Sequence, residues 1–165
     1  AFDYRFPWDE LIDDFKSHDA LDRADAIVEP MLAAIARAHT PAPEVVVPVP
    51  CSRERARERG YNPAWELARR LARKLRLPAR AQGLRRIVHT PPQRGTTRLE
   101  RMRALRGAFD VAPDARSWIH GRSIALVDDV MTTTATASEV ARTLLAAGAR
   151  DVRVWVAART PLPGE

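Results

Sequence analysis

The chain has 165 residues, of which 45% are hydrophobic and 29% charged, a composition typical of one globular domain with a substantial core. No apolar run approaches the ~20 residues of a membrane span and no signal peptide is visible, so insertion into a membrane is not expected. Cys51 is the only cysteine, which excludes an internal disulfide and a cysteine-built zinc site and favours a cytoplasmic location.

The net charge of +6 is unevenly distributed along the chain. Residues 53–106 contain 17 Lys and Arg against 4 Glu, a net charge of +13, whereas the other residues contain 10 basic and 17 acidic side chains, a net charge of −7. A basic central segment can attract phosphate groups, either on a small molecule or on a nucleic acid. A solvated, arginine-rich surface is the alternative interpretation.

The N-terminal part of the sequence predicts two helical segments and a strand. Apolar residues at helical spacing predict helices over residues 8–16 and 20–38, and Pro30 either kinks the second helix or begins another. The β-branched run at 44–50 predicts a buried strand. The strand leads into the sequence CSRERARERGYN, at 51–62, which we interpret as a basic loop.

The middle of the chain predicts a capped helix and a long polar loop. Asn62 is suited to be an N-cap and Pro63 to occupy the first turn of the helix that follows. A second strand is predicted over 81–88. Residues 89–107 are too polar and numerous for a simple turn, and loops of this kind tend to be functional.

The C-terminal third alternates between strand and helix. Strands are predicted over 124–130 and 151–158, and between them a helix over 136–147 that ends at Gly148. Strand, helix and strand joined by short links indicate a parallel sheet covered by helices, and therefore an α/β fold. No linker is evident, so residues 1–165 are expected to form a single domain.

The sequence IALVDDVMTTTAT, at 124–136, ends the central strand with two aspartates and a row of threonines. Ligands of open α/β sheets bind beyond the carboxyl ends of the strands. We predict that Thr136 begins the next helix and that Glu139 forms a capping box with it. The free N–H groups at this helix start and the threonine hydroxyls suit a phosphate. Asp128 and Asp129 suit the hydroxyls of a sugar or the waters of Mg²⁺, and should face opposite sides of the strand unless the backbone turns.

Two other nucleotide sites have an acidic strand end, but their phosphate loops are missing here. A Walker-B-like strand requires a GxxxxGK[ST] loop, and a Rossmann site requires GxGxxG. Neither occurs in the chain. A surface loop with solvated aspartates and helix-capping threonines remains the structural alternative.

The sequence at 124–136 resembles the signature of type I phosphoribosyltransferases, which bind 5-phosphoribosyl-1-pyrophosphate (PRPP). The resemblance implies the type I phosphoribosyltransferase fold, with helices on both faces of a parallel sheet and a small hood. It implies that the aspartates hold the ribose and the following loop holds the 5′-phosphate. The expected PRPP-binding residues are Asp128, Asp129, Val130, Met131, Thr132, Thr133, Thr134, Ala135 and Thr136. Thr134 departs from the signature, which usually has glycine there.

The segments PVPCSRERARERGYN, TPPQRGTTRLERMRALRGAF and AARTP narrow the resemblance to the ComF/GntX group, the competence protein F family. Membership implies PRPP as ligand, Mg²⁺ brought in by PRPP without direct protein ligands, and single-stranded DNA and the DNA-uptake machinery as partners. A homodimer is a further expectation to test. Relatives commonly begin with a four-cysteine zinc module, which this sequence lacks. The resemblance leads us to expect the hood in residues 1–40 and the mobile loop in residues 84–108.

The resemblance also suggests groups for the pyrophosphate, but no catalytic residue. Arg53 and Arg59 follow the first strand, where similar proteins have a pyrophosphate loop. The segment resembling a mobile cover contains Gln93, Arg98 and Arg101, although the two arginines could equally lie on a helix surface.

Two functions therefore remain open. A purine-type transferase often has an aspartate where this chain has Thr132, which cannot act as an ordinary general base. Cys51 is expected to be a buried filler, and His89 is the one histidine worth testing. The chain is either a phosphoribosyltransferase with an unknown acceptor or a non-catalytic module that binds PRPP and single-stranded DNA.

Overall fold

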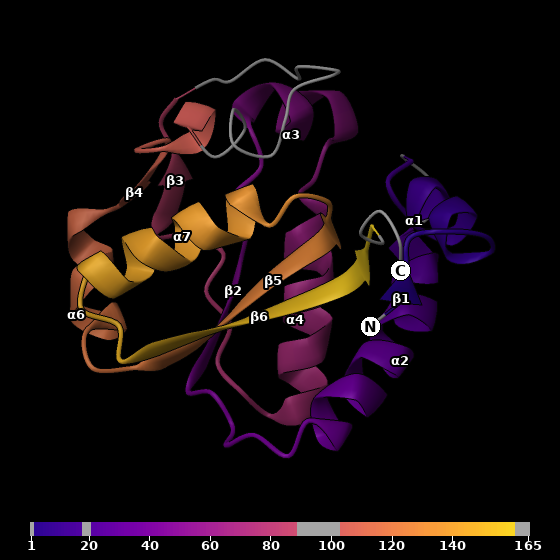
Figure 1. Ribbon diagram of the computed structural model, residues 1–165, viewed down its shortest axis with the longest axis horizontal. Helices are drawn as coiled ribbons and strands as arrows, with labels where there is room; N and C mark the ends of the chain where they lie inside the picture. The colour runs from indigo at the N-terminus through magenta and orange to yellow at the C-terminus, as the bar shows by residue number, and fades with distance from the viewer. Residues whose placement is uncertain (1, 18–20, 89–102, 161–165) are drawn as a thin grey trace.

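The computed structural model describes residues 2–17, 21–88 and 103–160, except the side chains of Leu21 and Arg53 (Figure 1). Its centre is a parallel sheet of four strands in the order β1–β6–β5–β2. The strands are β1 (Phe2–Asp3), β2 (Val45–Pro48), β5 (Ser123–Met131) and β6 (Asp151–Arg159). Residues 78–80 run along the other side of β2, where Val46 N–H donates to the Pro78 carbonyl at 2.9 Å.

Helices cover both faces of this sheet, as predicted, because apolar side chains alternate between the faces along each strand (Figure 1). Val46, Ala125 and Val127 lie in one core with residues of α1, α2 and α4. Val47 and Leu126 lie in the other core with residues of α6 and α7. The helices are α1 (Trp8–Phe15), α2 (Ala24–Arg37), α4 (Pro63–Leu75), α6 (Arg116–Ile119) and α7 (Ala135–Ala146), and short 3₁₀ turns precede α2 and α6 (Leu21–Arg23 and Pro113–Ala115).

Helix α4 begins where the sequence predicts it to begin. Pro63 is its first residue, and the Asn62 side chain accepts a hydrogen bond from the Ala64 N–H at 3.1 Å. Pro30 lies inside the single helix α2, so it does not begin a separate helix.

Two predictions about the middle of the chain need correction. The segment interpreted as a basic loop contains helix α3 (Arg53–Arg59), in which the Ser52 side chain accepts from the Arg55 N–H at 3.3 Å. The strand predicted over 81–88 shortens to β3 (Leu84–Arg86) and lies outside the parallel sheet. It pairs antiparallel with β4 (Phe109–Val111), which the sequence analysis did not predict. In the described part of the chain, no helix combines the length and apolarity needed to cross a membrane.

Candidate functional site

A pocket of about 440 Å³ lies at the carboxyl ends of β2 and β5. This is the edge where ligands of open α/β sheets bind. Segments that are far apart in the sequence form its wall, from the N-terminal region to the start of α7. The lining residues are Tyr4, Lys16, Val49, Pro50, Cys51, Arg55, Arg59, Asn62, Pro63, Ala64, Arg86, Asp128, Asp129, Val130, Thr132 and Thr136.

Asp128 and Asp129 both line the pocket, and their pKa values are shifted in opposite directions. Burial, followed by the negative charge of Asp129, raises the pKa of Asp128 well above its usual value. Burial also opposes ionisation of Asp129, but the charge of Lys16 and hydrogen bonds from Asp128 and the Val130 N–H together lower its pKa. The pair therefore offers an ionised carboxylate beside a carboxyl that tends to keep its proton. Such a pair can both accept and donate hydrogen bonds.

Lys16 is a site residue that the sequence analysis missed. It caps the C-terminal end of α1, and its Nζ lies 3.2 Å from Asp129 Oδ2, with both side chains 19% exposed. The Tyr61 hydroxyl donates to the Phe15 carbonyl, which ties the end of α1 to the segment before α4. Asp129 is thus ion-paired in the structure, yet it still lines the pocket. No local signal in the sequence connects Lys16 to the distant aspartates.

The threonine segment forms a small cup of about 30 Å³ beside this pocket, lined by Asp128 and residues 130–137. Helix α7 begins at Ala135, so the prediction that Thr136 caps it is wrong. Thr134 occupies the N-cap position with a left-handed φ of 59°, the conformation that suits the glycine usual in the signature. The predicted capping box is also absent, because Glu139 accepts from the Gly107 N–H at 2.6 Å and from Arg142 Nε at 2.9 Å.

Of the two arginines predicted to bind pyrophosphate, the structure gives the side-chain position of one. Arg59 lines the pocket, whereas the side chain of Arg53 is not described. Arg55 and Arg86 also line it and were missed. A helical spacing of four residues places Arg55 and Arg59 on one side of α3, which could have been recognised had the segment been read as a helix.

Tyr4 and Cys51 line the pocket but are poor general bases at neutral pH. Burial and a hydrogen bond from the Tyr4 hydroxyl to Asp13 raise the pKa of Tyr4 to about 12. Burial also raises the pKa of Cys51, against the opposing effect of the charges of Arg59 and Arg55. The Cys51 thiol is therefore predominantly protonated at pH 7, which disfavours a nucleophilic role.

The proposed cover residues and His89 lie outside the described residues. They are Gln93, Arg98 and Arg101, for which the structure gives no position. Within residues 2–17, 21–88 and 103–160, no group of three or more His, Cys, Asp or Glu side chains could hold a metal ion.

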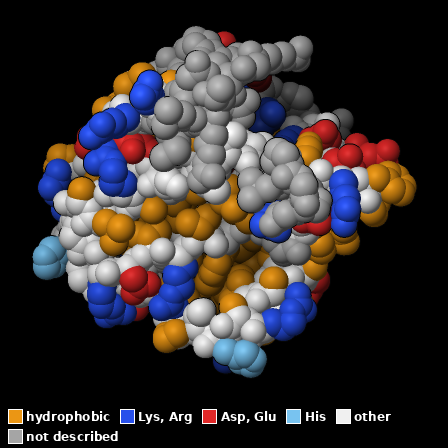
Figure 2. Space-filling model, viewed as in Figure 1, with side chains coloured by type: hydrophobic (Ala, Val, Ile, Leu, Met, Phe, Trp, Pro, Cys, Tyr) orange, Lys and Arg blue, Asp and Glu red, His pale blue; other side chains and the backbone are white. Residues whose placement is uncertain are grey.

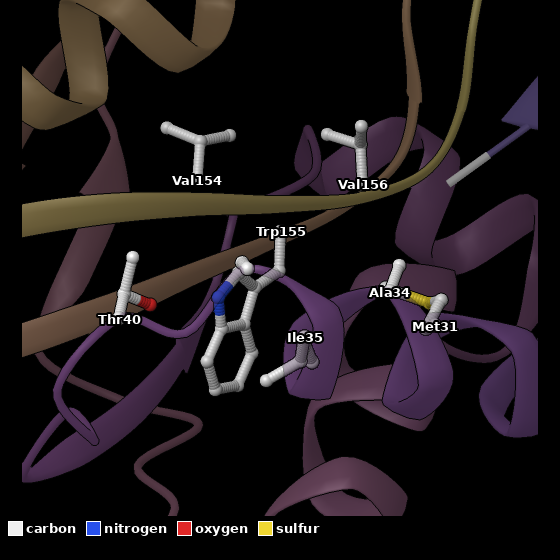
Figure 3. Close-up of a pocket in the computed structure, with 8 residues that line it drawn as sticks. Met31, Ala34, Ile35, Thr40, Val154, Trp155 and Val156 are labelled. Atoms are coloured by element: carbon white, nitrogen blue, oxygen red, sulfur yellow. The ribbon is translucent and has the colours of Figure 1, made fainter.

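A second hollow, of about 210 Å³, lies between α2 and β6 (Figure 3). Its labelled lining residues include Met31, Ile35, Val154 and Trp155, and none of the residues that line it is charged. Figure 2 shows hydrophobic side chains gathered in the middle of the face that Figure 1 presents, with Lys and Arg side chains around them. This hollow lacks the groups for phosphate chemistry, so the pocket at the end of β5 is the candidate site.

Two proteins are similar in sequence to the chain over most of its length. No protein-family model matches the chain. It is 38% identical over 117 residues to "Competence protein F" of Haemophilus influenzae, covering 71% of this chain and 51% of that protein. It is 31% identical over 162 residues to "DNA utilization protein YhgH" of Escherichia coli, covering 96% of this chain and 70% of that protein. The chain thus spans about half the length of the Haemophilus protein.

Solved structures confirm the predicted fold. Glutamine PRPP amidotransferase from B. subtilis, complexed with ADP and GMP, is similar with a TM-score of 0.56 and 20% identity. The match covers 91% of this chain and 30% of that one. A structure described as the allosteric regulatory enzyme of purine biosynthesis matches with a TM-score of 0.52, at 20% identity and with the same coverage. At this identity the likeness shows a phosphoribosyltransferase fold and nothing further.

Proposed function

Because the chain belongs to the family of competence protein F and DNA utilization protein YhgH, we propose that it binds PRPP and transfers the phosphoribosyl group to an acceptor during the use of incoming DNA. The observation that carries this proposal is the pocket at the end of β5. The acidic pair and several arginines line this pocket, and the threonine cup adjoins it at Asp128. Those groups match the diol, the 5′-phosphate and the diphosphate of PRPP.

The ribose would be held by the acidic pair. Ionised Asp129 accepts hydrogen bonds from hydroxyls, and Asp128 can donate its proton to one oxygen while its other oxygen accepts. The 5′-phosphate would occupy the cup at the start of α7. There Thr132, Thr133 and Thr136 supply hydroxyls, and the first turn of the helix supplies backbone N–H groups.

Magnesium would enter with PRPP. The described residues contain no cluster that could bind an ion alone, but carboxylates and PRPP oxygens are the hard ligands that Mg²⁺ prefers. Asp128 and Asp129 fit the waters of an ion that the ligand holds. Bound there, Mg²⁺ would neutralise part of the charge on the diphosphate.

A non-catalytic PRPP-binding module is the second candidate, and the protonation of the pocket favours it. Thr132 stands where purine-type enzymes have a carboxylate, and the raised pKa values of Tyr4 and Cys51 leave neither as a base at pH 7. In this role the basic central segment would bind single-stranded DNA through its phosphates. Binding should then weaken steeply with salt, because counterion release drives it.

Two measurements test these alternatives. Calorimetric titration with PRPP and Mg²⁺ tests binding, and its absence would refute both candidates. Release of pyrophosphate from labelled PRPP, with nucleobases and single-stranded DNA as acceptors, tests transfer. PRPP binding without release across all acceptors would leave the non-catalytic module. No gel shift with single-stranded DNA at low salt would remove the nucleic-acid half of that alternative.

A further inference from the structure

The outer side of β6 is open along most of the strand. β5 pairs with one side of β6 between Asp151 and Arg159, whereas β1 pairs with the other side only at Ala158 and Arg159. In the part of the chain that the structure describes, no strand lies beside residues 151–155 on that side. An edge of this length presents backbone N–H and C=O groups to which another extended chain can add.

The hydrogen bonds at the end of β6 show which residues face the open edge. The Tyr4 N–H donates to the Arg159 carbonyl at 2.7 Å, so Arg159 directs its backbone groups towards β1. Successive residues of a strand direct their backbone groups to alternate sides. Because the register of β6 against β5 is constant, the backbone groups of Arg153 and Trp155 also point to this side.

Apolar side chains flank this edge on both faces of the sheet. Trp155 points to the α2 face, where it lines the hollow of about 210 Å³ together with Ile35 (Figure 3). Val154 points to the opposite face and is 39% exposed. Side chains directly opposite each other on neighbouring strands share a face. A strand added here would therefore bury one apolar side chain in the hollow and the next one against Val154.

Arg153, two residues before Trp155, adds a requirement for negative charge. Its Nη1 is buried and has no hydrogen-bond partner among the described residues. Its Nε lies 3.3 Å from Asp151 Oδ1, but Asp151 Oδ2 also lies 3.6 Å from Arg150 Nε, so two guanidinium groups share one carboxylate. A buried donor without a partner destabilises the fold, and a carboxylate on the added strand would satisfy it.

A second copy of β6 does not supply both an apolar side chain and a carboxylate. Asp151 is the only acidic residue of β6, so it would have to lie opposite Arg153 when two copies pair around a two-fold axis. Ala149 would then lie opposite Trp155, and its methyl group would leave most of the hollow empty. The occupant that fits is therefore a segment of another protein.

We propose that the open edge of β6 binds an extended segment of a partner protein by strand addition. The segment has an apolar residue opposite Trp155, a second apolar residue opposite Val154 and a carboxylate opposite Arg153. Backbone hydrogen bonds provide the affinity, while the hollow and the guanidinium select the sequence. None of the residues that line the hollow lines the pocket at the end of β5, so this interaction does not depend on the proposed function.

Two end-capped peptides, STLVETS and STEVLTS, test antiparallel and parallel addition. In NMR titrations of the isotopically labelled protein, one of them should shift the amide signals of Arg153 and Trp155 and the indole signal of Trp155. Replacing Glu by Lys in that peptide should weaken binding by at least about 10-fold, the usual effect of losing hydrogen bonds to a charged group. Arg153→Met should bind the Glu and Lys peptides equally.

A pair of neighbouring alanines in α2 provides a test of the hollow and its control. Ala34→Glu places a charged side chain in the hollow and should weaken peptide binding by at least about 10-fold. Ala33 is exposed and does not line the hollow, so Ala33→Glu should bind the peptide within about 2-fold of wild type.

Four results would overturn the proposal. They are the absence of shifts with both peptides at millimolar concentration, equal affinity of the wild type for the Glu and Lys peptides, shifts confined to residues outside β6 and α2, and unchanged binding to Ala34→Glu. If sedimentation shows a dimer that Ala34→Glu dissociates, the edge binds a second copy, and the partner segment is wrong. Should the NMR spectrum of Ala34→Glu show an unfolded protein, the comparison of the two peptides with Arg153→Met decides.

Discussion

The ion pair between Lys16 and Asp129 supports a quantitative prediction about stability. Two unit charges 3.2 Å apart attract by about 5 kcal/mol at an effective dielectric constant of ~20. Desolvation of the two partly buried groups offsets more than half of this attraction. Exposed ion pairs contribute ~0.2–1 kcal/mol and breaking a buried pair costs ~3–5 kcal/mol, so a partly buried pair should lie between these values. Lys16→Met should therefore lower the free energy of unfolding by about 2 kcal/mol at pH 7.

The loss of unfolding free energy caused by Lys16→Met should become smaller as the pH falls. The lowered pKa of Asp129 contributes stability above the ordinary aspartate range, and this contribution is lost as pH falls through the folded pKa. Without Lys16, burial is expected to raise the pKa of Asp129, so acid neutralises the unpaired carboxylate sooner. The difference between Lys16→Met and wild type should shrink from pH 7 towards pH 4.

Urea denaturation followed by circular dichroism, at pH 7 and pH 4, measures both effects. Lys74→Met is the control, because it removes an ion pair to Glu29 whose side chains are 35% and 62% exposed, so it should cost less than ~1 kcal/mol. The reasoning is refuted if Lys16→Met costs no more than Lys74→Met at pH 7. A cost that grows towards pH 4 would also contradict it.

Three further variants test the strained loop, the acidic pair and the packing of the hairpin. Thr134→Gly should raise the free energy of unfolding by ~1 kcal/mol and the Tm by about 3 °C, since relieving ~1–2 kcal/mol of left-handed strain outweighs the added freedom of the unfolded chain; calorimetry showing an unchanged or lower Tm would argue against strain. Asp128→Asn combined with Asp129→Asn should abolish the heat of PRPP binding with an unchanged circular dichroism spectrum, and retained affinity would remove both residues from the site. Gly83→Ala should cost at least ~2 kcal/mol in urea, because its Cβ would lie 2.6 Å from Trp118 Cζ2 at a φ of +113°, and a wild-type midpoint would contradict this packing.

The sequence predicts those elements whose signals are local. The Asn62–Pro63 start of α4 and the apolar run of β5 each lie within a few residues, so the helix and the strand appear where expected. Helix α3 was missed because its sequence, RERARER, has no apolar stripe, although the Ser52 cap and the left-handed Gly60 mark its ends.

The residues of the candidate site also differ in whether a local sequence signal predicts them. Asp128 and the threonines lie in one continuous segment, so the motif places them together without knowledge of the fold. Lys16 and Arg86 reach the pocket through the packing of α1 and the pairing of β3 with β4, which no local pattern encodes. The predicted capping box failed for the same reason, because Gly107 belongs to a distant segment and takes the Glu139 carboxylate.

The pocket and the adjoining threonine cup concentrate features that folding alone would not favour. Thr134 has a strained backbone, Asp128 is a carboxyl whose burial raises its pKa, and Arg86 is partly buried with no acidic partner in the described residues. These three features come from two segments that the fold brings to the same end of the sheet, where each would meet a different chemical group of one ligand: a phosphate, a diol and a diphosphate. The apolar hollow beside β6 has no charged side chain in its lining, so no charge buried in that lining destabilises the fold. Destabilising features that are complementary to a ligand are expected at a binding site, and their coincidence here is a stronger argument for function than any one of the residues alone.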